Sequence, residues 1–282
     1  MNSSLPPASG GDLKLKEMST PDDLCLEPGS CDVLLPPGQL GRKLCTGFAC
    51  SERAVKQALR LRYHVFAVEL GHAPGGEGDG TVDRDEYDEQ MTHLVLLERD
   101  TGKVVGTYRV QTAGDANRYK GLYSAREYDL TAFRDYLPDA VECGRACIAR
   151  DHRKATALLA LWYGLRAYMT ATRKRWAFGC SSISSVDPDD GWRTMKTLRT
   201  KGFLHPDMHV PATTEFSCGD PEREFDDGLG PALALPRLFA AYMRLGARVI
   251  SQPAIDREFG TIDFLVMADG LHVNMARLGL TQ

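Results

Sequence analysis

Two charged residues interrupt an apolar, strand-like segment near the middle of the chain. Glu142 and Arg145 flank Gly144 within residues 139–148, and a basic helix start follows with no glycine-rich phosphate loop in between. A carboxylate or a guanidinium in an apolar strand is costly to bury, so each needs a partner, a water molecule or a substrate. We interpret this junction as a candidate site of acyl transfer.

Acyl transfer to an amine needs a base, because an amine attacks a thioester only in its neutral form. Glu142 is the candidate base, directly or through one water molecule, and a structural pair with Arg145 is the alternative. Strict strand alternation would separate these two side chains, so we expect a β-bulge at Gly144 that brings both to one side. Such a bulge would free backbone amides near Ala146 and Cys147 to stabilise an oxyanion, an effect worth about 3 kcal/mol.

A second group of charged residues lies nearer the N-terminus. Arg62 falls on the apolar stripe of an expected helix, and Arg109 is expected to point inward from a strand. Either arginine alone would be an ordinary snorkelling or edge residue. An acidic run between them in the sequence includes Asp83, Asp85 and Asp88. Taken together, the two arginines and the acidic run favour a buried network of paired charges.

The elements that would position these residues follow from periodicity and turn signals. The expected helices span residues 51–70 (with Ser51 as N-cap), 153–174 (with Asp151 as N-cap), about 191–201 and 233–245. The expected strands span residues 42–48, 93–98, 103–111, 139–148, 176–185, 248–253 and 261–267. Hairpins and βαβ links are mixed and no repeat is present, which predicts one α/β (α+β) domain over residues 39–282. Residues 1–38 are rich in Ser, Pro and Gly and are expected to be a disordered leader.

Composition narrows the possible classes of protein. The 282 residues carry 34 Lys and Arg against 38 Asp and Glu, so no overall positive charge favours nucleic acid as a partner. The eight cysteines form no metal-ligand spacing and indicate reduced thiols, so we predict no metal. No signal-peptide core or apolar run of spanning length is present, and the expected location is cytoplasmic.

Several motifs resemble known acyltransferases. Arg62 with Phe66, the three aspartates, the strand at residues 104–109 and Glu142-x-x-Arg145 resemble acyl-homoserine-lactone synthases of the N-acetyltransferase-like superfamily. Residues 177–182 and 245–264 resemble more closely the ornithine N-acyltransferases that make lyso-ornithine lipid, including hemolysin-like members. The resemblance covers most of residues 40–270. It implies a single GNAT fold, with a central mixed sheet, a bulged strand and flanking helices.

The resemblance also implies a donor and an acceptor. Relatives that use coenzyme A carry a glycine-rich loop, whereas residues 149–155 contain no glycine. Arg150, Arg153 and Lys154 would instead suit the phosphate of phosphopantetheine and the acidic surface of acyl carrier protein, although a solvated helix end is the alternative. The implied reaction moves a 3-hydroxyacyl group from acyl carrier protein to the α-amine of L-ornithine, with no other cofactor.

The resemblance leaves two roles open for the charged network. In the first, Arg145 or Arg109 binds the carboxylate of ornithine, and Asp83, Asp85 or Asp88 binds its second ammonium. In the second, the network only locks the N-terminal helix over an acyl tunnel. The late motif at residues 256–260 is either a surface turn or a contact for substrate or carrier protein.

Other functions remain open. The chain can also be an acyl-homoserine-lactone synthase that uses S-adenosylmethionine, an N-acyltransferase for glycine or serine, or a non-catalytic acyl-binding or hemolysin-like protein. If the product is a lipid, transient contact with the inner membrane is expected through basic helices such as residues 193–201.

Overall fold

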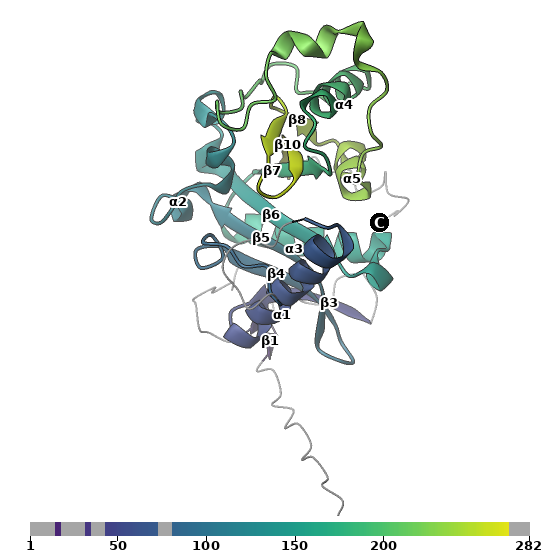
Figure 1. The fold of residues 1–282 in the computed structure, drawn as a ribbon. Coiled ribbons are helices and arrows are strands. Elements are labelled where there is room, and N and C mark those ends of the chain that lie inside the picture. Colours follow the sequence, from purple (N-terminus) through teal and green to yellow (C-terminus); the bar gives the residue numbers. More distant parts are fainter. Residues whose placement is uncertain (1–14, 18–31, 35–42, 73–80, 271–282) are drawn as a thin grey trace, which may run out of the picture.

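One mixed β-sheet runs through the whole molecule (Figure 1). The computed structural model describes residues 15–17, 32–34, 43–72 and 81–270. The strands lie in the order β1-β2-β3-β4-β5-β6-β7-β10-β8, and β9 pairs with β10. They span Leu15–Glu17 (β1), Asp32–Leu34 (β2), Leu44–Ala49 (β3), Thr92–Glu98 (β4), Lys103–Thr112 (β5), Ala140–Ile148 (β6), Trp176–Ile183 (β7), Arg248–Val249 (β8), Ala254–Asp256 (β9) and Thr261–Asp269 (β10).

The helices lie close to their predicted positions. They span Glu52–Tyr63 (α1), Ala113–Ala116 (α2), Ala155–Ala171 (α3), Pro188–Thr200 (α4) and Arg237–Leu245 (α5). The Ser51 hydroxyl accepts a hydrogen bond from the Ala54 amide at 3.2 Å, so the predicted N-cap of α1 is confirmed. The sequence did not predict that the helix continues as a π-helical segment, His64–Glu69 (η2), which is a rare form found mostly at functional sites.

The two large helices cover opposite faces of the N-terminal half of the sheet. Leu161 of α3 belongs to a buried cluster with Phe48, Leu94 and Val110 of the strands. Ala58 of α1 belongs to a different cluster, whose strand residues are Cys45, Ala49, Val95, Leu97, Val104 and Cys147. Because strand side chains alternate between faces, β3–β5 contribute to both clusters. The predicted α/β domain is therefore built as a central sheet flanked by helices.

A second half of the molecule is built on β7, β10, β8 and β9 (Figure 1). Helices α4 and α5 pack there around Trp192, Phe239 and Phe264. The predicted hairpin from residue 93 to 111 is confirmed as β4 and β5, and residues 202–231 are irregular as predicted, with two short 3₁₀ turns.

Three predicted helix starts were wrong. Helix α4 begins at Pro188, after Asp187 as N-cap, rather than at about residue 191. Helix α3 begins at Ala155, because Arg150–His152 form a separate 3₁₀ turn (η6) that keeps Asp151 away from the first helical amides. Helix α5 begins at Arg237 because Pro236 occupies its N-cap and a proline disfavours helical conformation in the residue before it. Most of the predicted leader lies outside the described residues, although β1 and β2 fall within it. No helix of the described part is long and apolar enough to cross a membrane.

The two halves of the sheet meet along a short parallel seam. Strands β6 and β7 pair only from Ala140 to Glu142 and from Trp176 to Phe178. Beyond these three pairs no ladder joins the two strands, and side chains of both line one cavity. The crossover between them is α3, as expected for a βαβ unit.

Candidate active site

The predicted β-bulge is present in β6. Thr107 of β5 pairs with Cys147, and Arg109 pairs with Gly144, so Arg145 and Ala146 together face one residue of β5. The bulge residue with positive φ is Arg145, at 50°. The sequence had predicted the unusual backbone conformation at Gly144 instead. A left-handed conformation is strained for an arginine and is typically retained where surrounding contacts hold it.

Glu142 is buried and fully engaged with donors. Its carboxylate accepts hydrogen bonds from the Ser124 amide (2.7 Å) and hydroxyl (2.6 Å), the Tyr123 amide (3.0 Å) and the Gln111 side chain (2.6 Å). Its exposed fraction is 2%. The amides of Tyr123 and Ser124 and the side-chain amide of Gln111 can only donate, so fixed hydrogen-bond donors occupy both carboxylate oxygens. This geometry favours an anchoring role for Glu142 over the predicted role as base.

A cavity of about 800 Å³ lies beside the bulge. Polar side chains from β6, β7 and β10 line it, among them Glu142, Arg145, Ser182 and Asp263. Helices α3 and α5 supply apolar lining, namely Leu158, Leu161, Leu238, Phe239 and Ala241. The volume is in the range of small-molecule sites, and the mixed lining suits a ligand with a polar group attached to a long apolar chain.

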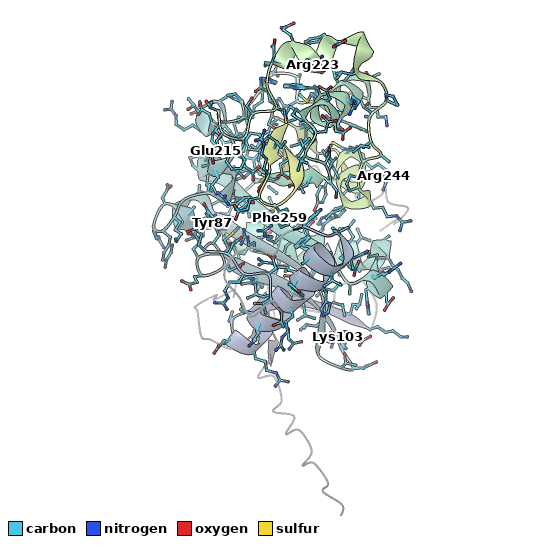
Figure 2. The ribbon with its side chains drawn as sticks, in the orientation of Figure 1. Tyr87, Lys103, Glu215, Arg223, Arg244 and Phe259 are labelled. Carbon is cyan, nitrogen blue, oxygen red and sulfur yellow. The ribbon has the colours of Figure 1, made fainter. Side chains whose placement is uncertain are left out.

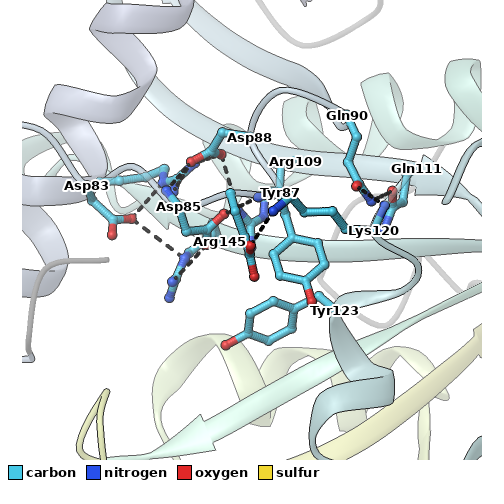
Figure 3. A network of polar contacts seen from close by, with 12 residues as sticks. Asp83, Asp85, Tyr87, Asp88, Gln90, Arg109, Gln111, Lys120, Tyr123 and Arg145 are labelled. Atoms are coloured by element: carbon cyan, nitrogen blue, oxygen red, sulfur yellow. Dashed lines mark hydrogen bonds and ion pairs between the residues drawn. The ribbon is translucent and has the colours of Figure 1, made fainter. Parts of the chain in front are cut away.

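The predicted network of Arg62, Arg109 and three aspartates lies beside this cavity, and Arg145 joins it, pairing with aspartates rather than with Glu142 (Figure 3). Arg62 donates to Asp83 at 2.7 Å and to Asp88 at 3.0 Å. Arg109 donates to Asp85 and, at 3.1 Å, to Asp88. Arg145 donates to Asp85 at 3.1 Å and lies 3.6 Å from Asp83.

The network is buried and its charges balance. Arg62 and Arg109 are 1% and 2% exposed, which confirms that both enter the interior. Burial alone would raise the pKa of Asp88, but the guanidiniums of Arg62 and Arg109 hold it well below the usual range. The pKa of Asp85 is also lowered despite its burial, chiefly by Arg109. Each guanidinium is paired with at least one aspartate, although the buried Nε atoms of Arg109 and Arg145 have no hydrogen-bond partner among the described residues. This pairing favours the locking role predicted for the network.

Arg145 connects the network to the cavity. Its guanidinium lies 4.5 Å from the ring centre of Phe259 and 5.9 Å from that of Tyr123. Phe259 comes from the predicted late motif and lies between the two halves of the molecule (Figure 2), with its ring 5.9 Å from that of Phe66. This motif therefore reaches the site through Phe259, whereas the side chain of Glu258 is 84% exposed.

Only some of the residues predicted to bind the acyl donor line the cavity. Arg153 and Lys154 line it, and Arg153 also donates to the Ile148 carbonyl and to Glu69, at 2.9 and 2.5 Å. Arg150 is exposed and does not line the cavity. Ala146 and Cys147, the predicted oxyanion donors, lie at the bulge and line the cavity.

The thiols near the site are poor nucleophiles. Burial raises the pKa of Cys147 to about 12, and it also raises the pKa values of Cys143 and Cys180. A reactive cysteine requires a lowered pKa, so these thiols fit the predicted role as core residues.

Sequence reasoning missed a cluster of three buried carboxylates beside the cavity, although one of them, Asp256, belongs to the predicted late motif. Ligand atoms of Glu127, Asp256 and Asp263 all lie within 4.8 Å of one another. Burial and the other two carboxylates raise the pKa of Glu127 well above its usual value, and burial raises that of Asp263 to about 6. The available signal was Asp263, an acid inside an apolar strand, as at Glu142.

Comparisons with known proteins agree with this architecture. Residues 61–163 match the family model of an acetyltransferase (GNAT) domain. An L-ornithine N(alpha)-acyltransferase of Rhodobacter capsulatus is 33% identical over 222 residues, covering 76% of this chain and 85% of the relative. An L-ornithine N(alpha)-acyltransferase of Agrobacterium fabrum is 30% identical over 247 residues, covering 82% of both proteins.

Solved structures with similar folds were also found. FeeM, an N-acyl amino acid synthase from uncultured soil microbes, is 11% identical with a TM-score of 0.47, covering 85% of this chain and 99% of FeeM. The AHL synthase LasI is 12% identical with a TM-score of 0.44, covering 86% of this chain and 99% of LasI.

Proposed function

The chain belongs to the family of L-ornithine N(alpha)-acyltransferases, and on that premise we propose that it acylates the α-amine of L-ornithine. It is an N-acyltransferase with a GNAT domain, so the non-catalytic alternatives fall away. The observation that carries the substrate proposal is the cavity at the bulge, where a charged polar lining meets the apolar surfaces of α3 and α5. An amino acid and a long acyl chain would meet there.

The proposed donor is a 3-hydroxyacyl group on acyl carrier protein, and the product is lyso-ornithine lipid. Arg153 and Lys154 support this donor because they are exposed side chains that also line the cavity. They would attract the phosphopantetheine phosphate and the acidic carrier surface. Arg150, which is exposed one turn earlier, would contact the carrier protein only.

The bulge supplies the proposed oxyanion site. The extra residue of a bulge is left outside the strand ladder, so an amide at Ala146 or Cys147 can bind the thioester oxygen as it gains charge. Arg145 is the proposed partner of the acceptor's carboxylate, because it is more exposed than Arg109 and lines the same cavity.

We also propose transient contact with the inner membrane, where the lipid product would be released. The predicted contact helix suits this poorly, since Arg193 pairs with Asp190 and Arg199 pairs with Glu224. Leu70, which lines the cavity, is 49% exposed and supports a contact at η2 instead. Leu70→Ser should reduce flotation with anionic vesicles, and unchanged flotation would remove η2 from the proposal.

The function can be tested with purified components. The protein, 3-hydroxyacyl carrier protein and L-ornithine should yield free carrier thiol and N-acylornithine, measured by thiol titration and mass spectrometry. The matching coenzyme A thioester should react more slowly, because residues 149–155 lack a glycine loop for its pyrophosphate. Faster acylation of glycine or serine would overturn the acceptor. Release of methylthioadenosine from S-adenosylmethionine would indicate an acyl-homoserine-lactone synthase.

A further inference from the structure

The described residues that line the cavity include two carboxylates, Glu142 and Asp263. An amine that enters as an ammonium must lose a proton to one of the groups around it before it can attack. Amide donors occupy both carboxylate oxygens of Glu142. Asp263 is the other carboxylate in the cavity lining.

Asp263 has a different set of hydrogen-bond partners. It lies on β10 with an exposed fraction of 4%, directly opposite Ser182 of β7. The hydroxyls of Ser182 and Thr261 donate to its two oxygens, the latter at 3.1 Å. A hydroxyl can rotate and accept a hydrogen bond, so both partners tolerate Asp263 in its charged and in its protonated form. This tolerance is what a residue that takes up and releases a proton requires.

The charges around Asp263 also favour proton uptake. Asp256 approaches it within 4.8 Å, and a like charge at this distance favours the protonated state of Asp263. Burial first, and then Asp256, raises the pKa of Asp263 to about 6, whereas Ser182, Thr261 and Arg145 act to lower it. The titratable and charged groups that face it from neighbouring elements are Glu127, Asp256, Arg145, Tyr123, Tyr128, Cys180 and Cys218.

We propose that Asp263 is the catalytic base of this site, which rests on the proposed acylation of an amino acid. The carboxylate of Asp263 takes one proton from the α-ammonium of the acceptor. The neutral nitrogen then forms a bond to the thioester carbon, and the carbon–sulfur bond breaks. The second nitrogen proton passes to the leaving thiolate, which gives the free thiol. Asp263 returns its own proton to solvent, so each turnover releases an amide, a thiol and one proton.

His72 is the competing base in the cavity. Its Nε2 lies 3.1 Å from the Ser184 hydroxyl, and its ring packs 4.9 Å from that of Phe259. Burial and the nearby charge of Arg145 lower the pKa of His72, which leaves it neutral at pH 7. Any test of Asp263 must therefore include a His72→Gln variant.

The experiment measures kcat/KM for L-ornithine from pH 5 to 9 with saturating acyl carrier protein donor. Asp263→Asn should lower the rate at pH 7.5 by about 100-fold or more, the usual contribution of a general base. Asp256→Asn removes a like charge, so the acidic limb of its profile should shift to lower pH. Ser182→Ala removes a donor to the carboxylate, so its acidic limb should shift to higher pH. These opposite shifts distinguish a base from a structural residue, and they stand even if Asp263→Asn fails to fold.

A less basic acceptor provides a second measurement. Ornithine amide has a more acidic α-ammonium than ornithine, so more of it arrives already neutral. The rate ratio of wild type to Asp263→Asn should therefore be several-fold smaller with the amide than with ornithine. An equal ratio for both acceptors would overturn the assignment.

Other outcomes would also decide the matter. If His72→Gln loses the acidic limb while Asp263→Asn keeps it, the base is His72 and the inference is wrong. Inactivation of the wild type by a chelator, with recovery on adding Mg²⁺ or Mn²⁺, would make the trio a metal site instead. A wild type that acylates serine but not ornithine would overturn the acceptor while the pH profiles still test Asp263. A wild type that acylates no amine would overturn both proposals.

Discussion

Asp88 compensates two buried guanidiniums at once, those of Arg62 and Arg109. Replacing it with alanine leaves two positive charges in the interior with one carboxylate fewer between them. We expect Asp88→Ala to lower the free energy of unfolding by about 3–5 kcal/mol, as found when one partner of a buried pair is removed. Urea denaturation monitored by circular dichroism measures this. Asp135→Ala, at an exposed position, is the matched control, and an equal effect in both variants would contradict the argument.

Glu142→Gln tests whether this residue anchors the fold. The glutamine amide group would face donors already pointing at the carboxylate, and at least one backbone amide would lose its partner. We expect a loss of about 1–3 kcal/mol in the free energy of unfolding. Glu86→Gln, in an exposed pair with Lys120, should cost less than about 1 kcal/mol. A stable Glu142→Gln protein with a large loss of kcat would instead restore Glu142 as the base.

Single residues show what the sequence could and could not predict of the site. Arg62 was found because its position on an apolar helical stripe is anomalous, and its burial is confirmed. The trio escaped because Glu127, Asp256 and Asp263 come from three elements that the sheet topology brings together. The spacing of residues along the sequence does not reveal that they lie close together in the fold. The charged motif at residues 256–260 drew notice, and it supplies Asp256 to the trio and the apolar Phe259 to the cavity lining.

At the scale of elements, the seam between β6 and β7 depends on a glycine. A Cβ added at Gly179 would overlap the carbonyl oxygen of Cys143, which is backbone and cannot move aside cheaply. We expect Gly179→Ala to separate the two strands and to lower the melting temperature and the acyltransfer rate together. Gly114→Ala in α2 is the control, since its nearest neighbour would be 3.6 Å away and no positive φ is required. Equal melting temperatures for the two variants would contradict this role.

Element type was more predictable than element ends. Hydrophobic periodicity located each large helix and most strands from β3 onward, because apolar stripes and alternation do not depend on the tertiary arrangement. It missed β9, and the strand predicted at residues 248–253 is reduced to β8. The ends of α3 and α5 depended on local backbone details, such as a 3₁₀ turn and the placement of Pro236. The bulge was predicted, but its position at Arg145 reflects contacts with Asp83, Asp85 and Phe259 that no local rule contains.

At the scale of the whole molecule, the two acidic groups predict opposite effects of pH on stability. The lowered pKa values of Asp85 and Asp88 contribute stability above about pH 4, the unfolded value, and this is lost as pH falls further. Asp263 acts in the other direction, because the folded state keeps a proton that the unfolded state releases. Its contribution falls as pH rises from about 4 to about 6, by about 3 kcal/mol in all.

We therefore expect wild-type stability to be highest near pH 4 and to decline as pH rises, through about pH 6 for Asp263 and with a further contribution from Glu127, whose pKa is also raised. In Asp263→Asn the part of this decline that belongs to Asp263 should be absent, so that the variant is more stable than wild type at pH 7.5. Urea midpoints measured from pH 3.5 to 8 test both statements. A variant that is less stable than wild type across the whole pH range would show that the charged form of Asp263 does not destabilise the folded state.

The short seam has a mechanical consequence. Only three residue pairs tie the two lobes of the sheet together across β6 and β7, while each lobe is internally braced by long antiparallel ladders. Small rotations about this junction would leave both halves of the sheet intact and change the width of the cavity between β6 and β7. We expect this rotation to be the motion of the protein that costs the least free energy. Acyl chains of different bulk would then be accommodated by different widths of the cavity.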